Sequence, residues 1–180
     1  MDVLHVIKSE HDRLRLLLTS PQSSQSRSAS PKALQQPTSG QHDRQSALKE
    51  ISREVKINLK LEEEYLYPEI SGLFAGSGAV LETCMANHSS IRRALDDMTS
   101  PSHSQDGDEV LDELRLLLGK HFETEERVLM PKIRQLIPTQ EREDLGQVLL
   151  DFKEEALAAV MLPVESKVAL VSSSKRKKRA

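Results

Sequence analysis

Two stretches of the chain repeat a pattern of acidic residues that could bind metal ions. Residues 58–70 (NLKLEEEYLYPEI) and 121–133 (HFETEERVLMPKI) share the pattern x-x-x-x-Glu-Glu-x-x-Leu-x-Pro-x-Ile. Upstream of each stretch, residues 11–15 and 88–92 share the pattern His-x-x-aliphatic-Arg. The chain therefore reads as a duplicated helical hairpin with His and Glu at matching places. Such groups, converging from two hairpins, are how helical bundles hold a pair of metal ions.

His121 and Glu125 have the spacing needed for two ligands of one metal site. Four residues turn an α-helix by about 400°, so the two side chains share one face, about 6 Å apart along the axis. In the other copy Glu62 stands at the matching place, but Asn58 takes the position of the histidine. Imidazole and carboxylate together suit iron, manganese or zinc rather than calcium. The Glu-x-x-His order of ferritin-like di-iron sites and the His-Glu-x-x-His motif of zinc proteases do not match.

Five helices are predicted from apolar residues that recur every three or four positions. They cover approximately residues 2–19, 44–71, 79–99, 108–136 and 140–160. We expect an all-α protein, an up-down-up-down four-helix bundle, with the additional C-terminal helix on its outside or at one end. The first four helices each have an inward-facing apolar stripe. These stripes also include polar residues, namely His11, Asn58, Glu62, His88, His121 and Glu125.

Carboxylates inside a bundle indicate that something compensates their charge, because a buried, unpaired carboxylate is costly. Agreement between four stripes and an internal repeat favours a metal site over a purely structural polar layer. Tyr65, one turn after Glu62, could hydrogen-bond a bridging carboxylate or simply fill the core. Cys84, on the same stripe as His88, could be a redox neighbour, an extra ligand or a small core residue. Val128 is placed on the stripe after Glu125. Glu63, Glu64 and Glu126 are interpreted as a solvated acidic face.

Composition limits the class of protein further. The single cysteine excludes an internal disulfide and agrees with a reducing compartment, and no apolar run approaches membrane-spanning length. We therefore expect a soluble, cytoplasmic protein without a membrane partner. Removing the five basic residues 175–179 from the 25 Lys and Arg leaves 20, against 28 Asp and Glu. An acidic body with few aromatic residues argues against nucleic-acid binding by the domain itself.

Two segments are predicted to lie outside the packed helices. Residues 20–43, rich in Ser, Gln and Pro, are expected to form a flexible loop inserted in a domain over residues 1–160. His11 and Asn58 are 47 positions apart, whereas the matching pair in the second hairpin is separated by 33, which indicates an insertion. Residues 161–180 are expected to be a disordered basic tail. A more specific hypothesis is that the tail is a nuclear-localisation signal or a contact for an unknown protein partner.

The combined pattern resembles the hemerythrin-like (HHE cation-binding) family. The resemblance covers about residues 1–160 apart from the loop, and it is most specific at residues 121–126 with Leu129 and Pro131. It implies a four-helix bundle around a non-haem di-iron centre with an oxo or hydroxo bridge. The family positions that hold the metals match His11, Glu62, His88, His121 and Glu125 of this chain, with the two glutamates as bridges.

Asn58 departs from the family pattern, since that position is normally a histidine. One metal could be held normally and its neighbour weakly, or both could bind and leave an open coordination position near Asn58. A nearby acid could also substitute, either Glu63 or Glu54, although Glu54 is expected to face solvent. We favour a dinuclear site with one under-coordinated metal.

We consider three functions of different classes. The first is a binding protein for oxygen or another small diatomic molecule such as nitric oxide, or a sensor of iron or redox state. The second is a di-iron oxidase, a peroxidase or a nitric-oxide-processing enzyme. The third is an interaction module with a partly decayed metal site. We rank the binding or sensing protein first, because the pattern shows no general acid or base beyond the ligands.

Overall fold

The computed structural model describes residues 1–19, 39–99 and 107–161 as an all-α bundle, and no strand occurs in these ranges. The expected all-α fold is confirmed. The long helices are α1 (Val3–Thr19), α2 (Ser39–Leu61), α4 (Ser77–Thr99), α5 (Gly107–Thr124) and α7 (Thr139–Met161). Two π-helical turns, η1 (Glu62–Leu66) and η3 (Glu125–Leu129), continue α2 and α5 and lead into the short helices α3 (Tyr67–Ile70) and α6 (Met130–Leu136).

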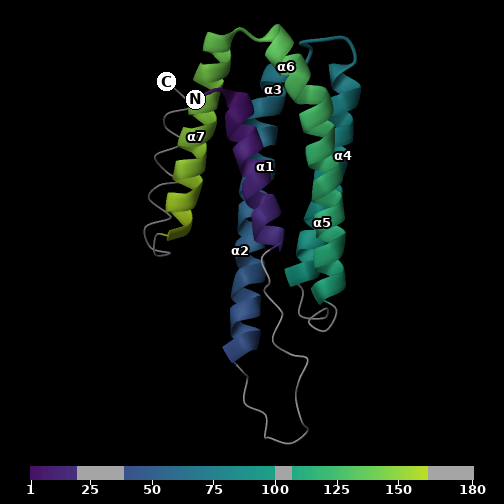
Figure 1. Cartoon of the computed structure of the whole chain (residues 1–180), viewed down its shortest axis with the longest axis vertical. Helices are drawn as coiled ribbons and strands as arrows, with labels where there is room; N and C mark the ends of the chain where they lie inside the picture. Colours follow the sequence, from purple (N-terminus) through teal and green to yellow (C-terminus); the bar gives the residue numbers. More distant parts are fainter. Residues whose placement is uncertain (20–38, 100–106, 162–180) are drawn as a thin grey trace, which may run out of the picture.

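Four helical segments form the bundle, namely α1, α2 with η1 and α3, α4, and α5 with η3 and α6. Helix α7 runs along the outside of α1 (Figure 1). The predicted helix boundaries agree with the observed ones to within a few residues, except that α2 begins at Ser39 instead of 44. Most of the expected loop, residues 20–38, and residues 162–180 of the expected tail lie outside the described residues. No helix in the described part of the chain is long and apolar enough to cross a membrane.

The apolar core is divided into two clusters, one on each side of a buried polar layer. One cluster, near the α3 and α6 end, includes Ile7, Leu66 and Ile133. The other, near the opposite end, includes Leu14 and Leu118. Each fully buried leucine or isoleucine stabilises the fold by about 1.5–3 kcal/mol relative to an exposed one. Burial of the two clusters therefore stabilises the bundle, and the bundle keeps the polar layer between them away from water.

Each copy of the repeated motif contains a π-helical turn at the same place. The N–H groups of Tyr67 and Met130 bond to carbonyl groups five residues earlier, those of Glu62 and Glu125. A proline follows directly in both copies, and its ring would clash with the carbonyl four residues before it in a regular α-helix. The wider turn gives the ring room and moves the following side chains around the helix axis by about one position.

Because of this shift, the inward-facing stripes expected from the sequence are wrong beyond Glu62 and Glu125. Tyr65 is only partly buried and Val128 is 39% exposed. The buried positions beyond the turns are instead Leu66 and Tyr67 in the first copy, and Leu129 and Met130 in the second.

Helix α7 is attached to the N-terminal half of α1 and to the residues that precede it. The Arg142 guanidinium donates to the Asp2 carboxylate at 2.8 Å, and Lys153 forms an ion pair with Glu10. Between these contacts, Gly146 lies against the backbone of the first residues, where a Cβ atom would overlap the Met1 carbonyl oxygen. A glycine at this position therefore permits the close approach of α7 to α1.

Candidate metal centre

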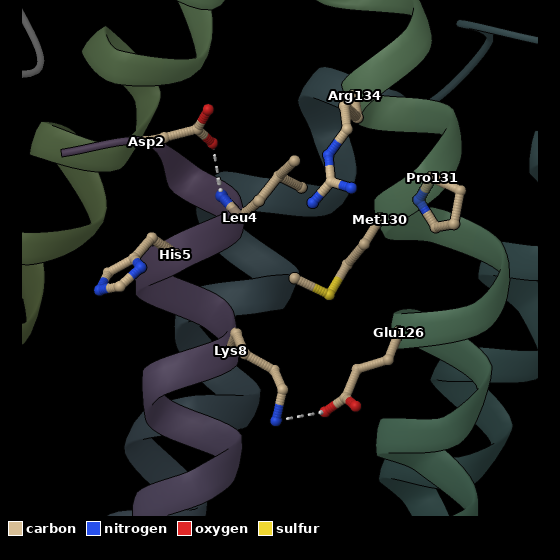
Figure 2. A pocket seen from close by; sticks show the side chains of 8 residues that line it. All are labelled: Asp2, Leu4, His5, Lys8, Glu126, Met130, Pro131 and Arg134. Carbon is tan, nitrogen blue, oxygen red and sulfur yellow. Dashed lines mark hydrogen bonds and ion pairs between the residues drawn. The ribbon is translucent and has the colours of Figure 1, made fainter.

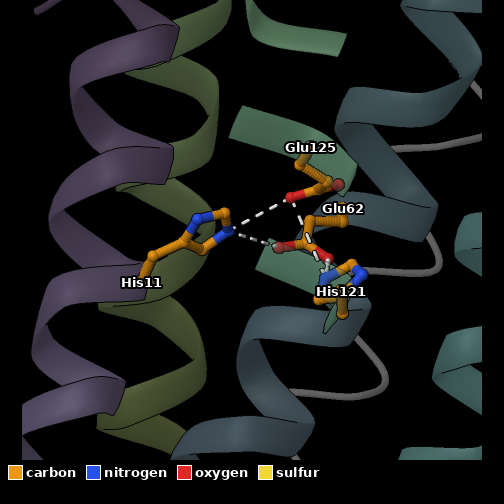
Figure 3. A group of neighbouring side chains, drawn as sticks. All are labelled: His11, Glu62, His121 and Glu125. Atoms are coloured by element: carbon orange, nitrogen blue, oxygen red, sulfur yellow. Dashed lines mark hydrogen bonds and ion pairs between the residues drawn. The ribbon is translucent and has the colours of Figure 1, made fainter. Parts of the chain in front are cut away.

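Four side chains converge in the polar layer between the two apolar clusters (Figure 3). His11 comes from α1, Glu62 from the start of η1, His121 from α5 and Glu125 from the start of η3. One ligand atom of each lies within 4.8 Å of the ligand atoms of the other three. All four residues are at most 1% exposed, so the cluster is closed to bulk water.

Glu62 is placed between histidines that lie on opposite sides of the cluster. Its Oε1 atom is 3.7 Å from His11 Nε2, and its Oε2 atom is 3.0 Å from His121 Nε2. Glu125 is similarly shared, with Oε2 3.1 Å from His11 Nε2 and 3.8 Å from His121 Nε2. Each carboxylate thus contacts imidazoles from two different helices.

His88, on α4, completes the five residues that the sequence singled out. Its Nε2 atom lies 3.0 Å from Glu62 Oε2 and 3.4 Å from His121 Nε2. The structure therefore brings His88 and His121 together on the Oε2 side of Glu62, and places His11 on the Oε1 side.

Asn58 lies inside the same layer and is 3% exposed. Its amide nitrogen donates to Glu62 Oε1 at 2.6 Å, which is the oxygen that faces His11. The asparagine therefore supplies a hydrogen bond to a carboxylate at the position where the repeat has an imidazole in its other copy.

The two acids considered as substitutes for that imidazole have other partners. Glu54, expected to face solvent, is buried and accepts bonds from Arg13 at 2.6 Å and Arg53 at 2.7 Å. Glu63 accepts a bond from His88 Nδ1 at 2.7 Å and two from Arg92. Neither carboxylate points into the cluster beside Asn58.

Tyr67 is a site residue that the sequence reasoning missed. Its hydroxyl donates to Glu125 Oε1 at 2.8 Å and lies 3.1 Å from His88 Nε2. Tyr65, expected there, instead packs its ring on Phe152 of α7, with the ring centroids 4.8 Å apart. The signal that could have identified Tyr67 is Pro68, because a proline inside a predicted helix marks a disturbed turn before it.

Cys84 is fully buried beside Tyr67, as its stripe position suggested. Burial and the nearby negative charge of Glu125 raise the pKa of its thiol to about 12, although the Tyr67 hydroxyl acts in the opposite direction. The side chain is therefore a neutral thiol in this environment and not a thiolate.

The side chains of the cluster shift one another's pKa values. Burial lowers the pKa of His11, but the carboxylates of Glu125 and Glu62 outweigh it and raise this pKa to about 10. Burial raises the pKa of Glu62, but His121 and the other imidazoles lower it well below its usual value. A metal ion would compensate the same carboxylates, and its binding would release the proton on His11.

The residues fit a metal ion better than they fit a hydrogen-bonded polar layer. His11 Nε2 and Glu125 Oε2 are buried 3.1 Å apart, yet neither has a hydrogen-bond partner of acceptable geometry in the described part of the chain. Buried polar atoms without partners are uncommon in native proteins and call for an explanation such as an ion. The nitrogen and oxygen donor set is one that iron, manganese and zinc accept.

The fold and the site together define an all-α bundle with a buried His and Glu cluster suited to cation binding. The chain belongs to the hemerythrin HHE cation binding domain family, whose model matches residues 2–133. The resemblance drawn from the sequence is thereby confirmed, and the match ends within α6, before α7. Neither the curated proteins nor the solved structures gave a match.

Proposed function

We propose that the cluster is a dinuclear non-haem iron site. The observation that carries this proposal is the position of Glu62, whose Oε2 faces His88 and His121 while its Oε1 faces His11. A carboxylate with imidazoles on both sides has the arrangement of a bridging ligand. His88 and His121 would hold one ion and His11 the other, with Glu62 and Glu125 shared between them.

The surroundings favour reversible binding or sensing. When bound, iron on the His11 side would supply an open coordination position for a small diatomic molecule such as oxygen or nitric oxide. On that side the chain has the amide of Asn58, already bonded to Glu62, in place of an imidazole. Phe122 stacks on the His11 ring at 4.1 Å, and the apolar clusters above and below exclude water. An apolar, closed environment protects a bound molecule from side reactions.

A second candidate, a redox enzyme that processes peroxide or nitric oxide, is favoured by one observation. The Tyr67 hydroxyl touches both Glu125 and His88, and the Cys84 thiol lies next to it. A phenol and a thiol in contact with a metal site are groups that can supply an electron and a proton. Turnover of peroxide or nitric oxide faster than by free iron would favour this candidate over simple binding.

Metal analysis with oxygen titration tests the proposal. Metal-free protein is loaded with Fe²⁺ without air, and the iron content per chain and the visible spectrum are then followed as oxygen is added. We expect between one and two ions per chain and a new ligand-to-metal absorption band. His121→Ala should lose the iron and the band, whereas His5→Ala, an exposed histidine on α1, should keep both.

The outcomes separate the parts of the proposal. If no stoichiometric iron binds, or if His121→Ala binds it as the unaltered chain does, the metal site is refuted. If iron binds but oxygen changes nothing in the spectrum, the metal site stands and the binding of oxygen is refuted.

A further inference from the structure

Two glutamates outside the cluster accept hydrogen bonds from the Nδ1 atoms of His11 and His88, whose Nε2 atoms face the cluster. His11 Nδ1 donates to Glu126 Oε1 at 2.9 Å, and His88 Nδ1 donates to Glu63 Oε1 at 2.7 Å. Both glutamates directly follow a cluster glutamate in the sequence, and both were expected to face solvent. They are instead mostly buried, with side chains 24% and 20% exposed.

An arginine in turn holds each of these glutamates. Arg15 bonds to Glu126 at 2.9 Å, and Arg92 bonds to Glu63 at 2.8 and 2.7 Å. Each arginine follows the histidine on its own helix by four residues, so the two side chains lie on one face a turn apart. The glutamate is thereby fixed between a histidine and an arginine. This arrangement accounts for the repeated His-x-x-aliphatic-Arg and Glu-Glu patterns, and we call each set a His–Glu–Arg clamp.

A clamp prepares its histidine to bind a metal. A carboxylate that accepts the Nδ1 proton fixes the ring tautomer, orients the ring and directs the Nε2 lone pair into the cluster. His121 has no such support, since its Nδ1 atom is buried without a hydrogen-bond partner among the described residues. Only His11 and His88 are therefore held in this way.

The two clamps differ in strength. Glu63 uses both carboxylate oxygens in a paired bond with the Arg92 guanidinium, the more specific and stronger geometry. Glu126 gives one oxygen, Oε1, to His11 and Arg15 together, with Lys8 at 3.8 Å. A carboxylate held through one oxygen is restricted less than one held through both oxygens by a guanidinium.

The weaker clamp also borders a pocket between α1 and α6. Figure 2 shows Glu126 and Lys8 facing each other across it, with Met130 between the helices above them. The pocket has a volume of about 500 Å³. Glu126 thus has open space beside it into which it could withdraw from His11.

We propose that Glu63 and Glu126 are positioning residues that make the two metal positions unequal. The His88 side, held by Glu63, is the tight position for a divalent transition-metal ion. The His11 side, held by Glu126 beside the pocket, is the position that gains and loses its ion rapidly. The proposal rests on the cluster being a metal site.

Stepwise titration of the metal-free chain with Co²⁺ tests it, because the visible spectrum of Co²⁺ reports each step. Glu63→Gln should weaken the first binding step by about 10- to 100-fold, the usual cost of losing a carboxylate behind a ligand histidine. Glu126→Gln should leave the first step unchanged, weaken the second and accelerate release of the second ion to a chelator. Glu64→Gln is the matched control, because Glu64 is exposed and forms its ion pair with Lys60, at 3.8 Å, away from the cluster.

Thermal melts of the metal-free variants show whether each one is folded before metal is added. Equal effects of Glu63→Gln and Glu126→Gln on the same step, or effects no larger than that of Glu64→Gln, would overturn the inequality while the metal site stands. A chain that binds a single ion should be weakened by Glu63→Gln and not by Glu126→Gln, and the reverse would also overturn the proposal. Absence of Co²⁺ binding in every form would refute the metal site itself.

Discussion

Asn58 donates its amide N–H to Glu62 Oε1 at 2.6 Å, and so occupies one oxygen of the carboxylate shared between both sides of the cluster. This hydrogen bond uses one of the two lone pairs of the oxygen that faces His11. It gives a physical reason why the His11 side should hold a metal less firmly than the His88 side. It also indicates how the difference between the two copies of the repeat can be tested.

Replacing Asn58 by histidine should restore the missing imidazole. We expect Asn58→His to raise the iron content of reconstituted protein to two ions per chain and to slow the loss of iron to a chelator. Asn58→Ala is the comparison, since it removes the hydrogen bond without adding a ligand. Iron content and the rate of iron loss are the measurements. Unaltered values in Asn58→His would contradict the assignment of this position to the metal site.

Tyr67→Phe should destabilise the metal-free protein. The change removes the hydroxyl that donates to Glu125 Oε1, and leaves a buried carboxylate oxygen without that bond. A buried acceptor that loses its donor costs about 1–3 kcal/mol in the free energy of unfolding. Tyr65→Phe is the matched control and should stay within about 0.5 kcal/mol, because Tyr65 is only partly buried and contacts Phe152 through its ring. Urea denaturation of the two variants gives the comparison.

The metal-free protein should lose stability as the pH rises from about 7 to 10. The folded-state pKa of His11 is raised to about 10 by Glu125 and Glu62, above its ordinary value of 6.5. A raised pKa contributes stability that is fully present below the ordinary value and is lost as the pH passes through the raised one. Thermal melts across this range are the measurement. The iron-loaded protein should show a weaker dependence, because a metal ion replaces the proton on His11.

Gly146→Ala should weaken the attachment of α7. The new methyl group would overlap the Met1 carbonyl oxygen and approach the Val3 nitrogen at 2.8 Å, so the helix must move outward. Overpacking of this kind costs about 1–3 kcal/mol. Gly119→Ala is the control, because nothing lies within 4 Å of the added atom and alanine favours the helix by about 1 kcal/mol. Opposite shifts in the melting temperature are expected, and a stabilised Gly146→Ala variant would refute the close packing of α7 on α1.

The helices and the convergence of His11, Glu62, His88, His121 and Glu125 could be predicted, because both depend on regular spacing. Their role as metal ligands stays a prediction. Leu14 and His11 share an α1 face by the three-residue rule, and both are buried. The spacing failed beyond Glu62 and Glu125, where the π-helical turns move Tyr65 and Val128 off the inner face. Periodicity alone cannot detect one additional residue in a turn.

The clamps were missed for a different reason. Glu63 and Glu126 lie beside the inward-facing stripe, where a charged residue normally points to solvent. Their burial depends on Arg15, Arg92 and the histidines of other helices, which are contacts between distant segments. Likewise the burial of Glu54 follows from its pairing with Arg13 of α1, and the spacing within α2 could not reveal it.

Each clamp joins a histidine of one hairpin to a glutamate of the other, and this pairing indicates how the chain could have originated. His11 of the first hairpin is held by Glu126 of the second, and His88 of the second is held by Glu63 of the first. One hairpin alone lacks the glutamate that supports its own histidine. An ancestral single hairpin could have completed these contacts only by pairing with an identical copy, as a symmetric dimer does. Gene fusion would then have freed the two halves to diverge, and Asn58, at the position of His121, is one of the places where they differ.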